Sequence, residues 1–373
     1  MKKIKFPIKR DQLIAFLMLL PSLILIGLFV YGFIFQTAYS SLTDWEGVAL
    51  GVKKNFIGLE NYKNLFTKLL DVRFRQSLVN TLFFTVFFIA GCLSLGLLFA
   101  ILLDQRIRYE GVFRLIFLYP MSLSFIVSGT VWRWLLNPKG GINLLPTLIG
   151  LQPLEIKWLT DRTQIWQFDW LILPKVFGYI LLVVMILLAF RYFRSGRNWG
   201  GGIAAMIGLA TLFWLISGKA NQLQIMNHTE IHGFNLALLG IIIAAVWQMS
   251  GYMMAMYLAG IRGIPEELRE AARVDGASEV RIYREIILPM LKPITLSAMI
   301  VLGHISLKIF DLIFVMVGPD NATTDVPGVL MFLTAFRGNQ FAKGAAIAMV
   351  MLIIVAVIIV PYLVNTLRTE HEL

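Results

Sequence analysis

The chain has 373 residues, of which 58% are hydrophobic and 15% charged, so it is more apolar than an average soluble domain. Its formal charge of +11 comes from basic residues scattered between apolar segments, which fits membrane-surface loops better than a nucleic-acid-binding face. The single cysteine, Cys92, lies inside an apolar run and excludes a disulfide framework or a cysteine-based metal site. We therefore expect an integral membrane protein.

Apolar runs long enough to cross a bilayer as helices recur along the chain. The first follows the basic segment MKKIKFPIKR and is too long for the core of a signal peptide, so we interpret it as a retained span. Six runs are expected to span the membrane: 13–38, 78–103, 112–136, 236–261, 293–318 and 345–367. Two shorter runs, 171–190 and 200–218, flank the sequence RYFRSGRNW and predict an extra helical hairpin.

The distribution of basic residues predicts the orientation of these spans, because Lys and Arg in short loops collect on the cytoplasmic side. An N-terminus inside the cell places most basic loop residues inside: Arg106, Arg108, Arg114, Arg191, Arg194, Arg197 and six more from Arg262 to Lys292. The outer stretch after Gly318 holds only Arg337 and Lys343, although the outer segment 48–76 departs from the pattern with six basic residues. The count predicts eight spans and two cytoplasmic termini.

The most polar long stretch, GIPEELREAARVDGASEVRIYREIILP, lies between two apolar runs. Pro265 suits the first position of a helix, and Glu266 and Glu267 follow where the helix dipole favours anions. Gly276 is expected to end this helix, since glycine enters the left-handed conformation without steric penalty. Four residues spaced i, i+3, i+4 and i+7 would share one flat face: Leu268, Ala271, Ala272 and Asp275.

A second short helix is expected after this turn, with Ser278 as its cap and its end before Pro289. The segment is then a helix–turn–helix elbow. One interpretation is a solvated loop whose charges fix the topology. The other is a docking surface for another protein, which the small-residue face and the length of the connection favour.

The sequence EAARVDGASEVRIYREIILP resembles the EAA loop of bacterial ABC-importer permeases, through Glu270, Ala271, Ala272, Gly276 and Pro289. RGIPEELREAARVDGAS, LKIFDLIFVM and FIGLENYKNLF resemble the carbohydrate, maltose-type branch of that family, so the likeness covers nearly the whole chain. Two features depart from it. The hairpin is not part of the usual six-span core, and MVGPDNATTDVP replaces the usual Thr-Gly-Gly-Pro sequence after the fifth core span.

The resemblance implies an all-α, polytopic transmembrane helical bundle with a six-span importer-permease core and an inserted two-span hairpin. Its expected segments are 1–77 (first span and outer loop), 78–166 (core spans two and three), 167–235 (hairpin) and 236–373 (remaining core spans with the elbow). The implied function is that of a non-enzymatic permease subunit of an ATP-driven importer for a carbohydrate or sugar-like solute. It would work by alternating access in the bacterial cytoplasmic (inner) membrane.

The resemblance also implies the partners and the role of the elbow. The partners are a second homologous permease subunit, a dimer of ATP-binding subunits, an extracellular or periplasmic solute-binding protein, and membrane lipid. ATP and Mg would bind the partner ATPase, and this chain has no G-x-x-x-x-G-K-[ST] phosphate loop. The residues expected to couple the permease to the ATPase are Glu270, Ala271, Ala272, Asp275, Gly276, Ala277 and Pro289.

Polar residues inside the apolar runs are candidates for a solute path, because ionisable groups in the membrane are costly. In GHISLKIFDLIF, the residues His304, Lys308 and Asp311 are spaced to share one helix face, beside Phe310. In the fourth core span, Gln248 and Tyr252 lie one turn apart with Trp247 adjacent, a mixture of aromatic rings and hydrogen-bonding groups that suits a sugar. Asn80 is a further candidate.

Each of these candidates has a structural alternative. Lys308 and Asp311 could form a self-neutralising ion pair, Trp247 and Tyr252 could lie at the membrane interface, and Asn80 could join two helices by a hydrogen bond. Two other functions stay open: a self-contained secondary transporter with a His/Lys/Asp relay, and a membrane enzyme acting on lipid-linked sugars. The spacing of His228 and His232 is weak support for a metal site, and we expect none.

Overall fold

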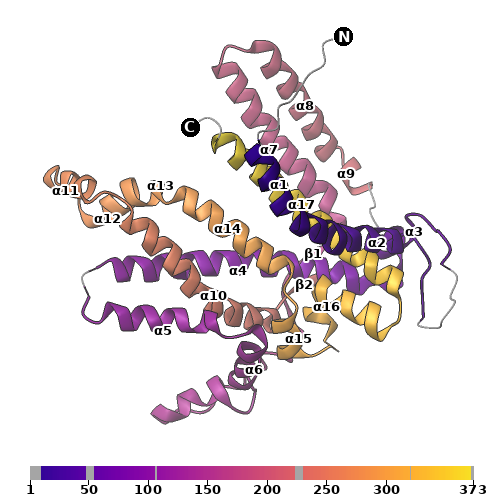
Figure 1. Cartoon of the computed structure of the whole chain (residues 1–373), viewed down its shortest axis with the longest axis horizontal. Helices are drawn as coiled ribbons and strands as arrows, with labels where there is room; N and C mark the ends of the chain where they lie inside the picture. Colours follow the sequence, from indigo (N-terminus) through magenta and orange to yellow (C-terminus); the bar gives the residue numbers. More distant parts are fainter. Residues whose placement is uncertain (1–9, 48–53, 106, 223–229, 320, 371–373) are drawn as a thin grey trace. The chain divides into compact units, whose positions relative to one another are not determined.

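The computed structural model describes residues 10–47, 54–105, 107–222, 230–319 and 321–370. The described chain is mostly helical, with one pair of short strands, which confirms the predicted all-α membrane fold (Figure 1). It divides into two compact units, one made of Met1–Leu65 and Pro327–Leu373 and the other of Phe66–Val326.

The first unit contains the first and last spans. Its helices are α1 (Arg10–Ile26), α2 (Gly32–Ser41), most of α3 (Glu60–Thr67), α16 (Pro327–Phe332) and α17 (Phe341–Glu370). A π-helical turn at Gly27–Tyr31 joins α1 to α2. Helix α2 packs against α17, and the rings of Trp45 and Phe341 lie 4.9 Å apart beside this contact.

The second unit contains the remaining spans. Its elements are α4 (Val72–Asp104), α5 (Glu110–Ser122), α6 (Phe125–Leu135), β1 (Gln164–Asp169), α7 (Leu173–Arg194), α8 (Asn198–Ile216), α9 (Lys219–Gln222), β2 (Ile231–Asn235), α10 (Leu236–Arg262), α11 (Glu266–Val274), α12 (Glu279–Ile282), α13 (Leu288–Met290), α14 (Lys292–Leu307) and α15 (Asp311–Val317). Helix α10 is its centre, because it packs against α4, α5 and α14 (Figure 1).

Small residues let the backbones around α10 approach closely, as is common where membrane helices pack. A Cβ atom on Gly96 of α4 would lie 2.4 Å from the Cβ of Met253. A Cβ atom on Gly251 of α10 would lie only 1.9 Å from the carbonyl oxygen of Phe117 in α5. Any larger residue at Gly251 would therefore force α5 away from α10.

The predicted extra hairpin consists of α7 and α8, which pack along each other. Strands β1 and β2 precede and follow it and pair antiparallel, with Gln167 opposite Gly233 and Asp169 opposite Ile231. The two ends of the hairpin are therefore held side by side at the strand pair.

Two predicted spans are not straight. The third bends by 101° between α5 and α6, where the Ser124 hydroxyl caps α6 by accepting a hydrogen bond from the Val127 amide at 3.3 Å. A 62° bend between α13 and α14, between Pro289 and Pro293, lies just before the fifth predicted span, 293–318, which is itself broken between α14 and α15. In the described chain, six single helices are long and apolar enough to cross a membrane, and the two bent pairs raise the number to eight.

Candidate functional site

The elbow, here residues 266–290, begins with α11 and turns at Gly276. Gly276 has φ +80°, which confirms the predicted left-handed glycine. The Gly276 amide donates to the Arg273 carbonyl at 3.0 Å, and the Ala277 amide donates to the Ala272 carbonyl at 2.9 Å. This pair of hydrogen bonds is the Schellman motif that closes helix ends, so the angle between α11 and α12 depends on the glycine conformation.

Three local predictions for the elbow were wrong. Pro265 is the residue that precedes α11, and Ser278 precedes α12 but forms no side-chain cap hydrogen bond. The second helix does not end before Pro289 but continues to Met290. A π-helical turn at Tyr283–Ile287 ends two residues before Pro289, and the wider turn accommodates a ring that lacks the usual N–H donor.

A buried carboxylate at the end of α4 anchors the elbow. Asp104 Oδ2 accepts hydrogen bonds from Arg269 Nη1 at 2.9 Å and from the Tyr283 hydroxyl at 2.7 Å. A second Arg269 nitrogen, Nη2, donates to the Ile261 carbonyl at 3.0 Å. Since the side chains of Asp104 and Arg269 are only 8% and 10% exposed, this is a buried ion pair. It connects both arms of the elbow to α4 and α10.

The elbow also packs against a hydrophobic cluster at the same ends of these helices. Ile282 and Ile287 of the elbow are buried with Leu103 of α4 and Ile261 of α10. Ala272 and Ala277 are partly buried against the same cluster. The side of the elbow that faces α4 and α10 is therefore fixed by both apolar and ionic contacts.

The other side of the elbow is exposed and partly apolar. Val274 is 88% exposed and Val280 77% exposed, while Leu268 is 45% exposed. Ala271 and Glu270 are exposed as well. Such apolar side chains on a polar segment are typical of a surface that another protein covers.

Helix α10 places the candidates Trp247, Gln248 and Tyr252 next to the bend between α5 and α6. Gln248 is buried and its Nε2 donates to the carbonyl of Leu123, at the bend, with a distance of 2.8 Å. The ring of Trp247 contacts that of Trp132 in α6, with centroids 5.8 Å apart. Tyr252 is half-buried. In a straight helix the Leu123 carbonyl would accept a hydrogen bond within the helix. Because the third span breaks here, this carbonyl can instead accept the hydrogen bond from Gln248.

Three buried polar atoms on α6 and α10 lack a hydrogen-bond partner within the described part of the chain: Ser128 Oγ, Trp132 Nε1 and Gln248 Oε1. Because buried polar groups in native proteins are almost always paired, such atoms call for a partner from outside the chain. Water or the hydroxyl groups of a solute would supply one.

Asn80 lies in α4, fully buried, and supports the segment that replaces the Thr-Gly-Gly-Pro sequence. Its Nδ2 donates to the carbonyls of Asp325 at 2.8 Å and Thr323 at 3.1 Å. Asn235 donates to the same Thr323 carbonyl at 2.9 Å, and Arg73 pairs with the Asp325 carboxylate. Burial raises the pKa of Asp325, and the Arg73 guanidinium opposes this shift. Asn80 thus holds the backbone of residues 323–325 through its Nδ2, while its buried Oδ1 has no hydrogen-bond partner among the described residues.

The prediction that His304, Lys308 and Asp311 share one helix face was wrong. Helix α14 ends at Leu307, and Asp311 is the first residue of α15. Phe310 between them has φ −138° and ψ −62°, which is not helical, and its ring stacks on that of Phe314. No glycine or proline marks this break, and Ile309 is buried in it.

Lys308 and Asp311 do not neutralise each other in the structure, since no ion pair joins these two described residues. Both side chains are exposed, whereas Phe310 is half-buried. Next to apolar helices, an exposed charge must face water or another protein rather than lipid.

A second buried ion pair, which the sequence did not indicate, lies beside β2. Both carboxylate oxygens of Glu230 bind the guanidinium group of Arg75 in α4, and Arg75 Nε lies 2.7 Å from Glu230 Oε2. His232 Nε2 lies 3.4 Å from the same oxygen. Burial lowers the pKa of His232, while Glu230 acts in the opposite direction. His228, the other residue of the weak metal pattern, lies outside the described residues.

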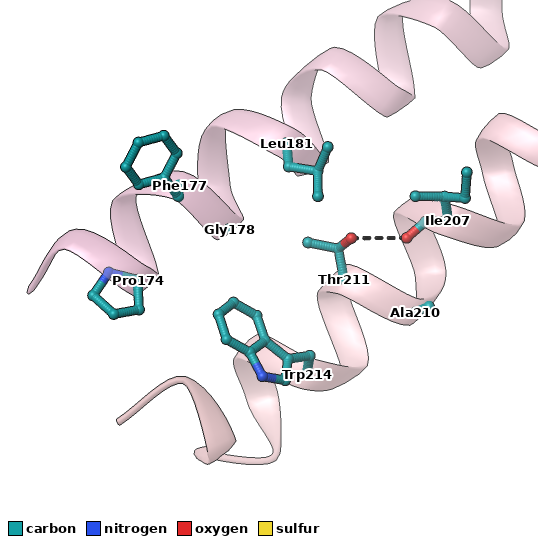
Figure 2. A pocket seen from close by; sticks show the side chains of 8 residues that line it. All are labelled: Pro174, Phe177, Gly178, Leu181, Ile207, Ala210, Thr211 and Trp214. Carbon is teal, nitrogen blue, oxygen red and sulfur yellow. Dashed lines mark hydrogen bonds between the residues drawn. The ribbon is translucent and has the colours of Figure 1, made fainter. Parts of the chain in front are cut away.

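Two cavities differ in the chemistry of their walls. The first, about 750 Å³, lies between α7 and α8 and is lined by apolar side chains such as Phe177, Leu181 and Trp214 (Figure 2). Its one hydroxyl, on Thr211, already donates to the Ile207 carbonyl at 2.8 Å, so this cavity does not suit a sugar (Figure 2). The second, about 330 Å³, lies in the first unit and has mixed walls: Phe33, Gln36, Thr37, Ser40, Trp45, Phe341 and Ala345.

Within the described residues, these features define a class of protein: a multi-pass helical membrane protein with a helix–turn–helix elbow between two spans. Residues 202–368 match the family described as binding-protein-dependent transport system inner membrane component. The chain is 36% identical to a probable ABC transporter permease protein of Pyrococcus horikoshii, over 95% of this chain and 96% of that one. It is 33% identical to the xylose/arabinose import permease protein of Haloferax volcanii, over 91% of this chain and 84% of the other.

The chain belongs to this family of ABC importer permeases. Its fold resembles that of a chain in the crystal structure of a bacterial ABC transporter involved in alginate import, with a TM-score of 0.64, 19% identity and 97% of both chains covered. The predicted family and fold are thus confirmed. Because the relatives are permease components of transport systems, the alternative of a self-contained secondary transporter is not supported.

Proposed function

We propose that this permease imports a carbohydrate or a sugar-like solute. Two relatives support this solute class: the xylose/arabinose import permease and, at 26% identity, the trehalose/maltose transport system permease protein of Thermococcus litoralis. The active assembly would contain a second permease, two ATP-binding subunits and an external solute-binding protein. ATP and Mg would bind the ATPase subunits, and the permease would undergo alternating access without catalysing a reaction itself.

The elbow would transmit the motion of the ATPase to the membrane helices. The observation that carries this proposal is its two-sided construction. One side is fixed to α4 and α10 through Asp104, Arg269 and Tyr283, and the other exposes Val274 and Val280. A segment that is rigidly joined to the membrane helices and offers an apolar surface to a partner can convert docking force into helix movement. Glu270, Ala271, Ala272, Asp275, Gly276, Ala277 and Pro289 are the coupling residues that we propose.

The solute path would run past α6, α10 and the break between α14 and α15. Gln248, with a free and buried carbonyl oxygen, and the ring of Trp247 would bind the hydroxyl groups and the C–H faces of the sugar. Tyr252 would lie further along the same wall. Lys308, Phe310 and Asp311 would line the path from the other side, and Asn80 would hold its wall through residues 323–325.

The proposed function is tested by reconstituting the whole assembly in proteoliposomes and measuring ATP hydrolysis against a panel of monosaccharides, disaccharides and sugar-like osmolytes. We expect hydrolysis to rise only when the binding protein carries its solute. The permease alone should transport nothing. Solute uptake by the purified single chain would favour a secondary transporter instead.

The positive-inside pattern predicts an orientation in which both termini and the α7–α8 turn lie in the cytoplasm. We expect a cysteine at position 195, introduced as Ser195→Cys in a Cys92→Ala background, to react with a membrane-impermeant thiol reagent only in inverted vesicles. Ser195 is exposed at the turn, so access should depend on the side of the membrane alone. Labelling in intact cells would reverse the orientation.

The exposed Asp311 gives a test of the solute path. We expect Asp311→Asn to lower uptake by about tenfold, the effect of losing one charge-assisted hydrogen bond. Adding Lys308→Gln should not restore uptake, because these two described residues form no ion pair with each other. Uptake by the reconstituted assembly measures both effects, with Glu155→Gln, an exposed acid in an outer loop, as the control. Full recovery in the double variant would assign Asp311 to packing.

A further inference from the structure

The inserted hairpin has a charge composition unlike the rest of the chain. Residues 170–222 contain five basic residues and no acidic residue: Lys175, Arg191, Arg194, Arg197 and Lys219. Three of the five lie within seven residues at the turn between α7 and α8. Within the described chain, no ion pair neutralises any of these three arginines.

Two of the three arginines line a cavity. It has a volume of about 560 Å³ and is bounded by Leu188, Arg191, Tyr192, Ser195 and Arg197. The chain reverses direction at Gly196, which has φ +74°, and this brings Arg197 to the same cavity as Arg191, which is six residues earlier in the chain. Arg194, at the end of α7, is not part of its wall. The wall of the cavity therefore combines two arginines, a tyrosine and a serine with one apolar residue.

Exposed aromatic side chains lie close in the sequence to the residues of this cavity. Trp199 is 88% exposed, and Phe190 and Phe193 are exposed on the same turn. Exposed aromatic rings at the ends of membrane helices are typical of the headgroup region of the bilayer. We therefore expect a cavity at this end of the two helices to lie in the headgroup region, between the lipid phosphates and the acyl chains.

We propose that this cavity binds the headgroup of an anionic phospholipid. Arg191 and Arg197 would each bind the phosphate through two parallel N–H donors. The planar guanidinium group of arginine allows this bidentate contact, whereas the ammonium group of lysine does not. The Tyr192 hydroxyl would donate to the same headgroup, and Leu188 would contact the start of an acyl chain. Basic cavities between membrane helices on the cytoplasmic side bind such headgroups in other proteins. The leaflet follows from the proposed orientation, whereas the binding itself depends on neither that orientation nor the solute.

The ordinary explanation of these arginines is that they fix the topology of the hairpin. That explanation treats the three equally, since only charge near the end of a span matters to the positive-inside rule. The cavity distinguishes them, because Arg194 carries the same charge on the same turn but lies outside the wall. Arg194→Gln is therefore a matched control for Arg191→Gln and Arg197→Gln.

The test measures binding of phosphatidylglycerol to the purified full-length permease in phosphatidylcholine nanodiscs, by titration with a fluorescent phosphatidylglycerol. We expect Arg191→Gln together with Arg197→Gln to weaken binding by about thirtyfold or more, because both guanidinium groups lose their charge-assisted hydrogen bonds to the phosphate. Arg194→Gln should change it by less than about threefold. Replacing Arg191 and Arg197 by lysine keeps the charge and the topology, and should still weaken binding severalfold.

Several results would overturn the proposal. Equal losses in the Arg194 variant and the Arg191 and Arg197 variants, or wild-type binding by the lysine variant, would reduce the site to general charge attraction. Equal binding of phosphatidylcholine would exclude an anionic site, and displacement by inorganic phosphate at millimolar concentration would indicate a soluble anion. Unchanged lipid binding with loss of co-purification of the second permease would assign the arginines to a protein interface.

Discussion

Asp104→Asn should leave the permease able to assemble with its ATPase but should lower solute uptake by at least tenfold. The carboxylate is the common acceptor for Arg269 and Tyr283, which lie on the two arms of the elbow. Without its charge, the guanidinium of Arg269 stays buried and unpaired, a loss that costs about 3–5 kcal/mol in other proteins. The elbow would then shift relative to the ends of α4 and α10 instead of moving together with these helices.

Two activities measured in proteoliposomes separate lost coupling from lost folding. Basal ATP hydrolysis reports an assembled complex, and hydrolysis stimulated by the solute-loaded binding protein reports coupling. We expect Asp104→Asn to keep the first and lose most of the second. Arg273→Gln is the control, because Arg273 forms exposed ion pairs with Glu266 and Glu279 on the same elbow. Exposed ion pairs contribute little to stability, so the uptake rate of this variant should be within about twofold of the wild-type rate.

Normal stimulation in the Asp104 variant would show that the anchor is not part of coupling. A double variant, Asp104→Asn with Arg269→Gln, refines the interpretation, since removing both partners leaves no unpaired buried charge. If the anchor only stabilises the fold, the double variant should recover uptake together with protein yield. If it transmits motion, yield should recover and uptake should not.

The features that the sequence predicted correctly depend on local signals. A run of about twenty apolar residues specifies a membrane helix wherever it occurs, which is why the hairpin was found although it lies outside the six-span core. Gly276 was predicted because the left-handed conformation is nearly specific to glycine when it follows a helix. The elbow motif likewise needed only neighbouring residues.

The features that the sequence missed depend on contacts between distant segments. Asp104 and Arg269 are 165 positions apart, so no local pattern relates them. The break at Lys308–Phe310 has no glycine or proline to mark it, and the buried Ile309 fits a packed core rather than a continuing helix. The bend after Ser122 is stabilised by Gln248 of α10, whose side-chain amide donates a hydrogen bond to the Leu123 carbonyl. In each case the partner lies on another element.

The polar residues within the membrane spans also divide into those that the sequence predicted correctly and those that it did not. Spacing alone placed His304, Lys308 and Asp311 on one face, and this failed because the face assumes an unbroken helix. Gln248 was found by its type, since an amide in an apolar span is costly and demands a partner. Ser128 and Trp132, whose polar atoms are buried nearby without a partner among the described residues, were missed because serine and tryptophan are ordinary in such spans.

Replacing Gly276 with valine should abolish most uptake while leaving membrane insertion intact. At φ +80°, a β-branched residue is strained, and backbone strain of this kind costs about 1–3 kcal/mol. A shift of that size lowers the population of the closed turn by about fivefold to 150-fold. Apart from Gly276 and its two chain neighbours, no atom of the described residues lies within 4 Å of the position that a Cβ would occupy, so the effect would come from backbone conformation and not from a clash.

This absence of neighbours supplies a control that differs only in backbone preference. Asparagine tolerates the left-handed conformation better than other residues with a side chain, so Gly276→Asn should keep most of the uptake that Gly276→Val loses. The measurements are uptake by the reconstituted assembly and co-purification of the ATPase with each variant. If valine and asparagine transport equally well, the turn angle does not matter for coupling. If both fail equally, the exposed side chain itself blocks the ATPase, and the surface at Gly276 must approach its partner within the width of one side chain.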